Sequence, residues 1–303
     1  MRILLTGSSG TIGTRLFETL LGKHETVGVD IRQNKWKSEL NGRTVIADLR
    51  KSEELAKLPT DFDMVIHFAA NARVYELVKD PQLALDNIIM TFNVLEYMRK
   101  NNISRVMFAS SREAYGNIMD SEAISEEMVR VENCESPYAA SKISGEAMIQ
   151  SYSRVYGVRL VILRFSNVYG MYDDSDRVVP LWIRQCMKGE DLTVYGRDKS
   201  LDFTYIDDTI EGVVKAIDRF DEVKGSIFNL SYGDEVSLLS VAKLLKQLLH
   251  SNNGTIIKGS RLGEVWKFEA NISKAKSLLG YKPRIGIEEG LDRTVKWYNG
   301  MIG

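Results

Sequence analysis

The sequence predicts an α/β protein whose main body is a doubly wound parallel sheet, followed by a smaller α/β region toward the C-terminus. Two observations carry this prediction. Short apolar runs alternate with longer amphipathic stretches through the first half of the chain, which is the order that strand–helix–strand units produce. A glycine-rich turn also follows the first apolar run directly and opens a helical pattern, as in nucleotide-binding α/β folds.

Six runs in the first half are predicted to be buried strands. They are short, rich in β-branched residues and apolar on both faces, as a sheet covered on both sides requires. The predicted strands are 2–6, 26–30, 43–47, 63–68, 105–110 and 159–165. The predicted helices among them are 11–22, 51–58, 81–101 and 137–156.

The second half of the chain has a different pattern. Its helical stretches are 180–188, 207–220, 237–250, 273–279 and 287–299, and its scattered strand candidates are 192–195, 202–206, 226–230 and 254–258. No Pro- or Ser-rich linker separates the halves. We therefore expect a Rossmann-type domain over 1–165 and a substrate-binding region over 166–303, with the chain crossing between the two.

Composition excludes several classes of function. The 303 residues carry a formal net charge of −1, so no basic excess favours nucleic acid or an anionic membrane as partner. The two cysteines are isolated and the three histidines are far apart, so neither a disulfide framework nor a metal site is expected. The start "MRILLTG" lacks the apolar region of a signal peptide, and no run reaches the length of a membrane span; a cytoplasmic location is expected.

The stretch "LLTGSSGTIGTRL" is the strongest candidate for a cofactor loop. Gly7, Gly10 and Gly13 would let the backbone turn tightly and approach a pyrophosphate, which the N-terminus of the next helix would bind. A glycine triplet alone can also mark an ordinary turn. The strand–loop–helix order favours dinucleotide binding.

Asp30 ends the second predicted strand. A carboxylate there would accept hydrogen bonds from adenosine ribose hydroxyls and repel a 2′-phosphate, which favours NAD over NADP. Two alternatives stay open: Asp30 is a turn residue at a strand end, or the nearby Arg32 accepts a 2′-phosphate.

Three tyrosines precede a lysine by four residues, at 75–79, 138–142 and 195–199. Tyr138 and Lys142 follow a Ser-Pro pair that suits the cap and first turn of a helix, so the two side chains should share a helix face. A lysine beside a phenol would lower the pKa of the tyrosine, which could then take a proton from a sugar hydroxyl. Ser111, at the end of the fifth strand, is the candidate to hold that hydroxyl.

With these residues, the chain resembles extended short-chain dehydrogenase/reductases of the NAD-dependent nucleotide-sugar epimerase/dehydratase family, and UDP-glucose 4-epimerases in particular. The resemblance runs nearly end to end. The matching motifs are TGSSGTIG, HFAANARV, SSREAYG, SPYAASK, RFSNVYG, LDFTYIDD and RLGEVWKFEANISKAKSLLGYKP.

The resemblance implies the following site. Its catalytic residues would be Ser111, Tyr138, Lys142 and, in some branches, Glu113. Its contacts with NAD would come from Gly7, Gly10, Thr11, Ile12, Gly13, Asp30, Asp48, Leu49, Phe68, Ala69, Ala70, Asn87, Tyr138 and Lys142, with Asn87 opening a helix. Its contacts with the nucleotide sugar, a UDP-sugar by preference, would come from Ser111, Arg112, Tyr138, Asn167 and Arg261.

Several functions fit this resemblance. The favoured one is a 4-epimerase of the UDP-glucose/UDP-galactose type, acting through a transient 4-keto sugar. The alternative is a 4,6-dehydratase or decarboxylase, because Glu113 stands where dehydratases have the base for C5. Arg112 beside it cannot act as an acid; the two residues would form a structural ion pair, or Arg112 would meet a substrate anion. A non-catalytic NAD-binding sensor is the second alternative.

Some residues depart from the family pattern, and one feature bears on assembly. Leu201 replaces an arginine that usually contacts the diphosphate, Met171 replaces a proline and Met90 a glycine. Helices 81–101 and 137–156 carry extra apolar residues, which in relatives pair across a two-fold axis. These residues are Ile88, Phe92, Leu95, Ile149 and Tyr152. A homodimer is expected, although the same residues could simply cover the sheet.

Overall fold

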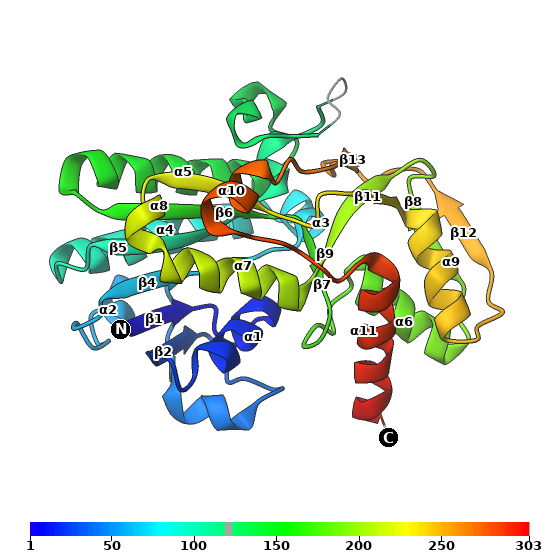
Figure 1. The fold of residues 1–303 in the computed structure, drawn as a ribbon, viewed down its shortest axis with the longest axis horizontal. Helices are drawn as coiled ribbons and strands as arrows, with labels where there is room; N and C mark the ends of the chain where they lie inside the picture. Colours follow the sequence, from blue (N-terminus) through cyan, green and yellow to red (C-terminus); the bar gives the residue numbers. More distant parts are fainter. Residues whose placement is uncertain (119–122, 303) are drawn as a thin grey trace.

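A seven-stranded sheet forms the main body of the molecule (Figure 1). The computed structural model describes residues 1–118 and 123–302. Its strands are β1 (Arg2–Thr6), β2 (Glu25–Asp30), β3 (Thr44–Ile46), β4 (Met64–His67), β5 (Arg105–Ser111), β6 (Arg159–Phe165) and β10 (Ser226–Leu230). They lie in the order β10-β6-β5-β4-β1-β2-β3. Every neighbouring pair is parallel, so the predicted doubly wound parallel sheet is confirmed.

Helices cover both faces of this sheet. The helices of the first half are α1 (Thr11–Leu20), α2 (Ser52–Leu55), α3 (Val74–Lys79), α4 (Gln82–Lys100) and α5 (Pro137–Tyr156). One apolar core holds α1 and α7 (Ile206–Asp218), and a second holds α4 and α5 on the other face. The strands are therefore buried on both sides, which explains why their sequences are apolar without alternation.

A smaller lobe follows β6. It contains α6 (Val178–Lys188), α9 (Leu238–Leu248) and α11 (Ile287–Ile302). The short helices α8 (Phe220–Val223) and α10 (Ser273–Leu279) pack against α7, beside the large sheet. Its strands are β7 (Asn167–Tyr169), β8 (Leu192–Tyr195), β9 (Ser200–Tyr205), β11 (Glu235–Ser237), β12 (Thr255–Lys258) and β13 (Lys267–Phe268). Strands β7, β11 and β13 all pair with β9, and β12 pairs with β8.

The chain crosses between the two lobes, and one prediction about its path was wrong. The run 226–230 was expected in the smaller region, but it forms β10 and extends the large sheet beside β6. A five-residue apolar run has the same pattern in either sheet. The chain returns to the large sheet through α7, and this return places the run beside β6.

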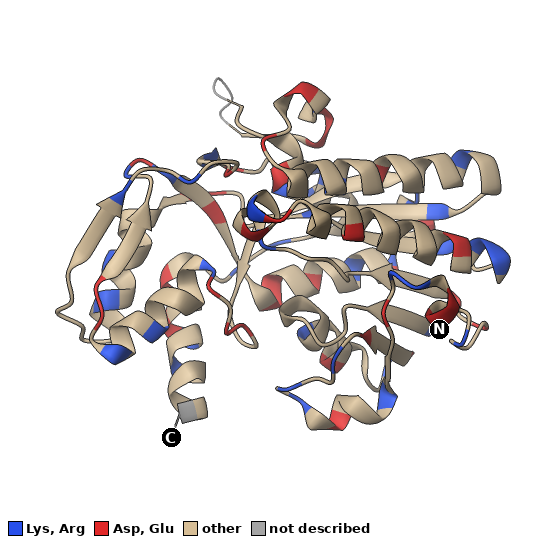
Figure 2. Cartoon of the chain, turned by 180° about the vertical axis from the view of Figure 1, so that it is seen from behind, with Lys and Arg blue, Asp and Glu red and all other residues tan. Residues whose placement is uncertain are grey.

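Charge is spread over the whole surface. In Figure 2 basic and acidic residues are interspersed on both lobes, in agreement with the formal net charge of −1. Within the part of the chain that the structure describes, no helix is long and apolar enough to cross a membrane.

His67, the last residue of β4, predicts an acid-sensitive fold. Its Nδ1 lies 2.8 Å from Thr6 Oγ1, and its Nε2 lies 3.3 Å from Thr91 Oγ1. Burial lowers the pKa of His67 to about 3, from 6.5. Between these two pH values the unfolded chain binds a proton at His67 and the folded chain does not. The free energy of unfolding should therefore fall as pH drops from 6.5 toward 3.

The expected loss amounts to about 5 kcal/mol below pH 3, of which about 3 kcal/mol appears by pH 4. Urea unfolding between pH 7 and 4 would measure that part, with His67→Gln as a reference that cannot titrate. Equal pH dependence of the free energy of unfolding in both proteins would contradict this account of His67.

Candidate active site

The glycine loop packs against the end of β4 so closely that side chains cannot be accommodated. Gly7 has φ +71°, and a Cβ on it would stand 2.7 Å from the Ala69 amide nitrogen. A Cβ on Gly13 would stand 2.0 Å from the Gly7 carbonyl oxygen. Gly10 caps α1 and, having no side chain, leaves the first amides of the helix for a phosphate. The loop therefore fits the pyrophosphate of a dinucleotide.

Asp30 lies at the carboxyl end of β2, next to this loop. Its carboxylate accepts hydrogen bonds from the Ser9 amide at 2.9 Å and from the Arg32 amide at 3.3 Å. Burial raises the pKa of Asp30 despite these bonds. The carboxylate thus holds the turn, as the simpler interpretation required, and its contact with a ribose stays a prediction.

The remaining predicted cofactor residues lie around the same end of the sheet. Ile12, Phe68 and Ala70 line the central cavity. The Thr11 hydroxyl donates to the Tyr172 carbonyl at 3.0 Å, joining the loop to the smaller lobe. Ala69 borders Gly7 through its backbone.

Two residues that were predicted to contact the cofactor, Asp48 and Leu49, make contacts within the protein. Asp48 pairs with Arg50 at 2.7 Å, and this bond lowers the pKa of the Asp48 carboxyl. Leu49 is buried in the core on the α4–α5 side of the sheet. Both lie near the expected adenine position, where their contact with NAD stays a prediction.

Asn87 lies inside α4 and does not open it, which corrects the expected position. Its Oδ1 accepts from the Asn71 amide at 2.7 Å, while its Nδ2 donates to the Asn71 carbonyl at 3.0 Å and to Ser141 Oγ at 3.1 Å. Ser141 in turn donates to the Tyr138 carbonyl at 2.8 Å. Asn87 therefore positions the start of α5, a role that its residue type alone did not reveal.

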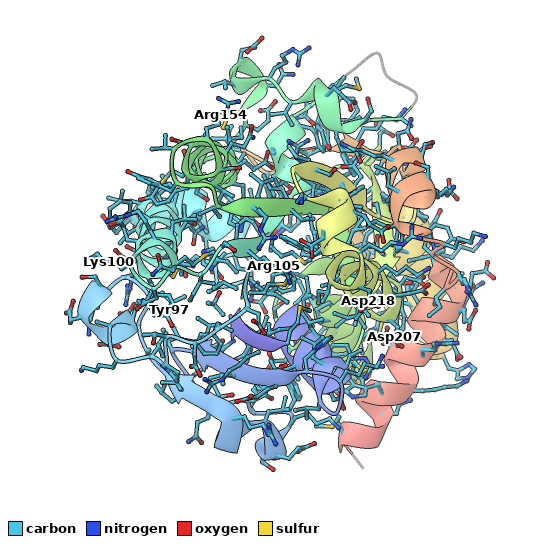
Figure 3. The ribbon with its side chains drawn as sticks, turned by 60° about the vertical axis from the view of Figure 1, so that its left-hand side comes forward. Tyr97, Lys100, Arg105, Arg154, Asp207 and Asp218 are labelled. Atoms are coloured by element: carbon cyan, nitrogen blue, oxygen red, sulfur yellow. The ribbon has the colours of Figure 1, made fainter. Side chains whose placement is uncertain are left out.

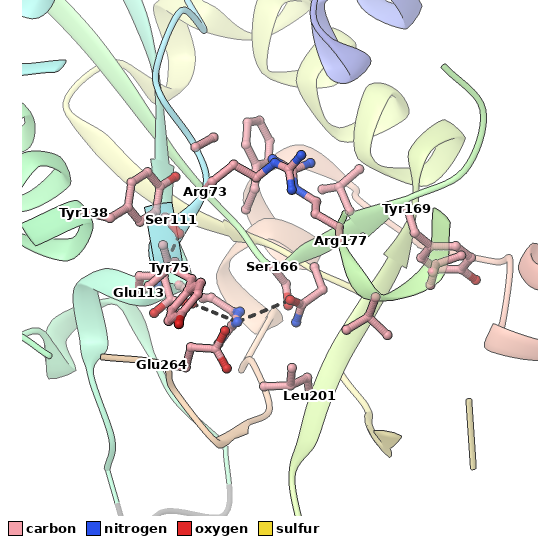
Figure 4. Close-up of a pocket in the computed structure, with 18 of the residues that line it drawn as sticks. Arg73, Tyr75, Ser111, Glu113, Tyr138, Ser166, Tyr169, Arg177, Leu201 and Glu264 are labelled. Carbon is pink, nitrogen blue, oxygen red and sulfur yellow. Dashed lines mark hydrogen bonds and ion pairs between the residues drawn. The ribbon is translucent and has the colours of Figure 1, made fainter. Parts of the chain in front are cut away.

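A cavity of about 470 Å³ opens where β4, β5 and β6 end (Figure 4). Ser111, Tyr138 and Lys142 all line it, so the structure brings the predicted catalytic set together. Ser136 caps α5 as predicted, accepting from the Ala139 amide at 3.2 Å. The other two Tyr–Lys pairs, at 75–79 and 195–199, line the same cavity, which their sequence context did not indicate.

A charge that the sequence did not indicate, that of Arg177, acts on Tyr138. Burial raises the pKa of Tyr138, and the positive charge that opposes this most strongly belongs to Arg177. The Lys142 ammonium lies 5.8 Å from the centre of the tyrosine ring and donates to the Ala109 carbonyl at 2.8 Å. Burial lowers the pKa of Lys142 to about 8. Lys142 is not among the groups that oppose the raised pKa of Tyr138 most strongly, so its expected effect on that pKa stays a prediction.

A buried ion pair connects α5 to β6. Arg164 contacts Glu146 at 2.7 Å, with 3% and 6% of the two side chains exposed. Arg164 also donates to the Tyr115 hydroxyl at 3.0 Å and the Glu126 carbonyl at 2.7 Å. This network ties the catalytic helix to β6 and was not predicted, because nothing marks two distant charges as partners in a sequence.

Arg112, Glu113 and Asn167 form a second cluster that lines the cavity; Figure 4 labels Glu113 next to Ser111. Arg112 NH2 lies 2.8 Å from Glu113 Oε1 and donates to Asn167 Oδ1 at 3.2 Å. Asn167 Nδ2 donates to the Asp202 carbonyl at 3.1 Å. Burial raises the pKa of Glu113, and Arg112 opposes that effect. Ser111 Oγ accepts from the Glu113 amide at 3.2 Å.

Arg261, the predicted diphosphate ligand, is held between aromatic rings. Its guanidinium carbon lies 3.9 Å from the centre of the Tyr195 ring and 4.8 Å from that of Tyr75. Lys199 pairs with Glu264 at 2.8 Å. Leu201, which stands where an arginine is usual, lines the same cavity as Arg261 and Lys199.

A glycine loop at the start of a parallel sheet, together with Ser, Tyr and Lys in one cavity at its carboxyl edge, defines a dinucleotide-dependent short-chain dehydrogenase/reductase of the extended type. Residues 3–231 match the model of the NAD dependent epimerase/dehydratase family. The chain belongs to this family, is an enzyme of it, and uses NAD.

Three relatives illustrate the range of substrates among similar proteins. A putative UDP-glucose 4-epimerase of Methanocaldococcus jannaschii is 32% identical, over 97% of each chain. UDP-glucuronate 4-epimerase 5 of Arabidopsis thaliana is 32% identical, over 99% of this chain and 76% of its own length. The structure of a Bacillus cereus UDP-glucuronic acid 4-epimerase with UDP-glucuronic acid and NAD is 30% identical, with a TM-score of 0.92 over 99% of this chain and 100% of its own.

Proposed function

We propose that the protein is a UDP-sugar 4-epimerase that interconverts gluco and galacto configurations, with UDP-glucose/UDP-galactose as the reference pair. The observation that carries the proposal is the meeting of Ser111, Tyr138 and Lys142 at the edge of the NAD domain. The relatives described above, which are 4-epimerases by name, support it.

The residues have distinct roles in this proposal. NAD supplies reversible acceptance of a hydride from C4 of the sugar. Tyr138 takes the proton of the C4 hydroxyl and returns it, Ser111 holds the C4 oxygen, and Lys142 holds the nicotinamide ribose. The raised pKa of Tyr138 matches the returning step, in which the phenol must donate. Arg177, whose charge opposes the raised pKa, favours the forward step.

The geometry of Glu113 favours this reaction over dehydration. A base for C5 would need a free carboxylate directed at the substrate, but Glu113 gives one oxygen to Arg112 at 2.8 Å. The dehydratase or decarboxylase reading stays as the second candidate, because Glu113 lines the cavity and its Oε2 has no hydrogen-bond partner among the described residues.

A product assay tests the proposal. The purified protein is incubated with UDP-glucose, UDP-galactose, their N-acetyl and glucuronate forms and GDP-mannose without added NAD, and masses and stereochemistry are measured. A C4 epimer of unchanged mass is expected. Loss of water or carbon dioxide would support the second candidate, and no turnover of any sugar would favour a non-catalytic NAD-binding sensor.

A homodimer and a cytoplasmic location complete the proposal. Figure 3 shows α4 and α5, which end near Lys100 and Arg154, next to each other outside the sheet. Two of the predicted interface residues, Leu95 and Ile149, are instead 1% exposed in the sheet-facing core, which corrects that part of the prediction. Phe92 is 46% exposed and Leu85 48%, so these residues carry the proposed contact.

We expect Leu85→Lys/Phe92→Lys to shift the protein to a monomer, because buried lysines would face each other across a two-fold axis. Size-exclusion chromatography with light scattering at several concentrations measures this. A wild-type protein that is monomeric throughout would remove the dimer from the account.

A further inference from the structure

The charge of the cavity exceeds what its own ion pairs neutralise. Among the described residues, its basic side chains are Arg73, Lys79, Arg112, Lys142, Arg177, Lys199 and Arg261, and its acidic ones are Glu76, Glu113, Asp173, Asp176 and Glu264. The whole chain is slightly negative. The cavity is therefore locally positive, and an anionic substrate should enter it.

Arg112 is the most deeply buried of the arginines that line the cavity, and it directly follows Ser111. Its side chain is 9% exposed, and only NH2 is engaged, by Glu113 and Asn167. Arg112 NH1 is buried and has no partner among the described residues, and the same holds for Glu113 Oε2. A buried guanidinium nitrogen without an acceptor is costly, so its presence in a cavity indicates that a ligand completes it.

A second pair of arginines is available for a separate anion. Arg73 and Arg177 point into the cavity across from Tyr138 in Figure 4. Each forms a long ion pair with one carboxylate, at 3.9 Å from Arg73 to Asp176 and at 3.7 Å from Arg177 to Asp173. A diphosphate could use such groups together with Arg261, which leaves Arg112 for another negative group.

The position of Arg112 indicates which group that is. Arg112 follows Ser111, and in the proposed function, on which this inference rests, Ser111 holds the C4 oxygen. The substituents next to C4 are the C3 hydroxyl and the C6 group on C5. A planar guanidinium binds a carboxylate more strongly than a neutral hydroxyl. We propose that Arg112 binds a carboxylate at C6, so that the preferred substrate is a UDP-uronic acid of the gluco/galacto pair.

Glu113 does not oppose this placement. Burial raises the pKa of its carboxyl, and a second carboxylate nearby would raise it further. If Glu113 binds a proton when the uronate enters, its Oε2 can donate a hydrogen bond to the uronate while its Oε1 remains with Arg112. In that case uronate binding would take up a proton.

The test compares kcat/KM for UDP-glucuronate and UDP-glucose. The wild-type enzyme should prefer the uronate by at least about 10-fold, and Arg112→Met should reduce the ratio of the two values by about 10- to 100-fold, as loss of a charge-assisted hydrogen bond implies. A general loss of activity lowers both kcat/KM values by the same factor and leaves their ratio unchanged. Arg43→Met, an exposed arginine in the large lobe, is the matched control and should keep the wild-type ratio.

The outcomes separate the two proposals. Epimerisation of UDP-glucose with no turnover of UDP-glucuronate would overturn the uronate inference and leave the 4-epimerase standing, while absence of both would remove the 4-epimerase itself. An equal fall of both values in Arg112→Met, with weaker inhibition by UDP, would assign Arg112 to the diphosphate and also overturn the inference. If Arg112→Met fails to fold, Arg112→Met/Glu113→Gln removes the unpaired charge and gives the same ratio test.

Discussion

Tyr138→Phe should lower kcat by roughly 10²- to 10⁴-fold, the usual contribution of a positioned acid–base group, while the protein keeps its NAD. The phenol is buried in the cavity with Ser111. The change removes one oxygen and leaves the ring packing intact. Initial rates of C4 epimer formation and the NAD content of the purified variant measure the two parts of this prediction.

Two other tyrosines provide matched comparisons, because Tyr75 and Tyr195 also precede a lysine by four residues and line the same cavity. Their rings stack on Arg261, and phenylalanine keeps that stacking. We expect Tyr75→Phe and Tyr195→Phe to act mainly on KM. A Tyr138→Phe enzyme with nearly wild-type kcat, or a larger loss in either comparison variant, would show that Tyr138 is not the base.

Glu113→Ala should reduce the free energy of unfolding by about 3–5 kcal/mol, because it leaves the buried Arg112 guanidinium without its counter-ion. The two side chains are 9% and 5% exposed, so solvent screens their interaction little. Arg112→Met/Glu113→Leu removes both charges and should recover most of the loss. Urea denaturation of the three proteins measures this, and a double variant as unstable as Glu113→Ala would contradict the ion-pair account.

Glu113→Gln separates the structural role from a catalytic one. In a 4-epimerase this variant should still form the C4 epimer, since glutamine keeps an oxygen for Arg112. In a dehydratase the same change would stop product formation and leave a reduced cofactor after the first hydride transfer. Product identity and absorbance at the wavelength of the reduced nicotinamide distinguish the two.

The pH dependence of catalysis should follow from the same burial. The raised pKa of Tyr138 means that the phenolate needed for the forward step becomes more abundant as pH rises, so kcat/KM should increase with pH from neutrality. The pKa of Lys142, about 8, adds a separate titration at lower pH than that of Tyr138, whose pKa is raised above its ordinary value.

Local patterns in the sequence were sufficient for six of the seven strands of the large sheet and for the meeting of Ser111, Tyr138 and Lys142 in one cavity. The glycine loop lies between one strand and one helix, and Tyr138 and Lys142 lie on a single helix with a capped start, so both depend on neighbours in the chain. Charge effects were not predictable in this way. The pKa of Tyr138 depends on its burial and on Arg177, which comes from the other lobe and bears no recognisable motif.

Contacts between residues that are distant in the sequence explain the other features that were not predicted. Arg164 and Glu146 are partners only because β6 and α5 pack together. Leu95 and Ile149 face the core because of the rotation of their helices about their axes, which a long helix with scattered apolar residues leaves undetermined. Asn87 was recognised by its position in a motif, but its bonds to Asn71 and Ser141 needed three-dimensional placement.

The fate of the hydrogen on C4 tests whether the enzyme epimerises its substrate by removing and returning the same hydride. The enzyme is given a UDP-hexose that carries deuterium at C4, without added NAD, and the product is analysed by mass spectrometry and NMR. We expect a C4 epimer of unchanged mass with the deuterium still on C4, because the same hydride leaves and returns while Tyr138 exchanges only the hydroxyl proton. Deuterium found at C6 in a dehydrated product, or lost to solvent, would contradict it.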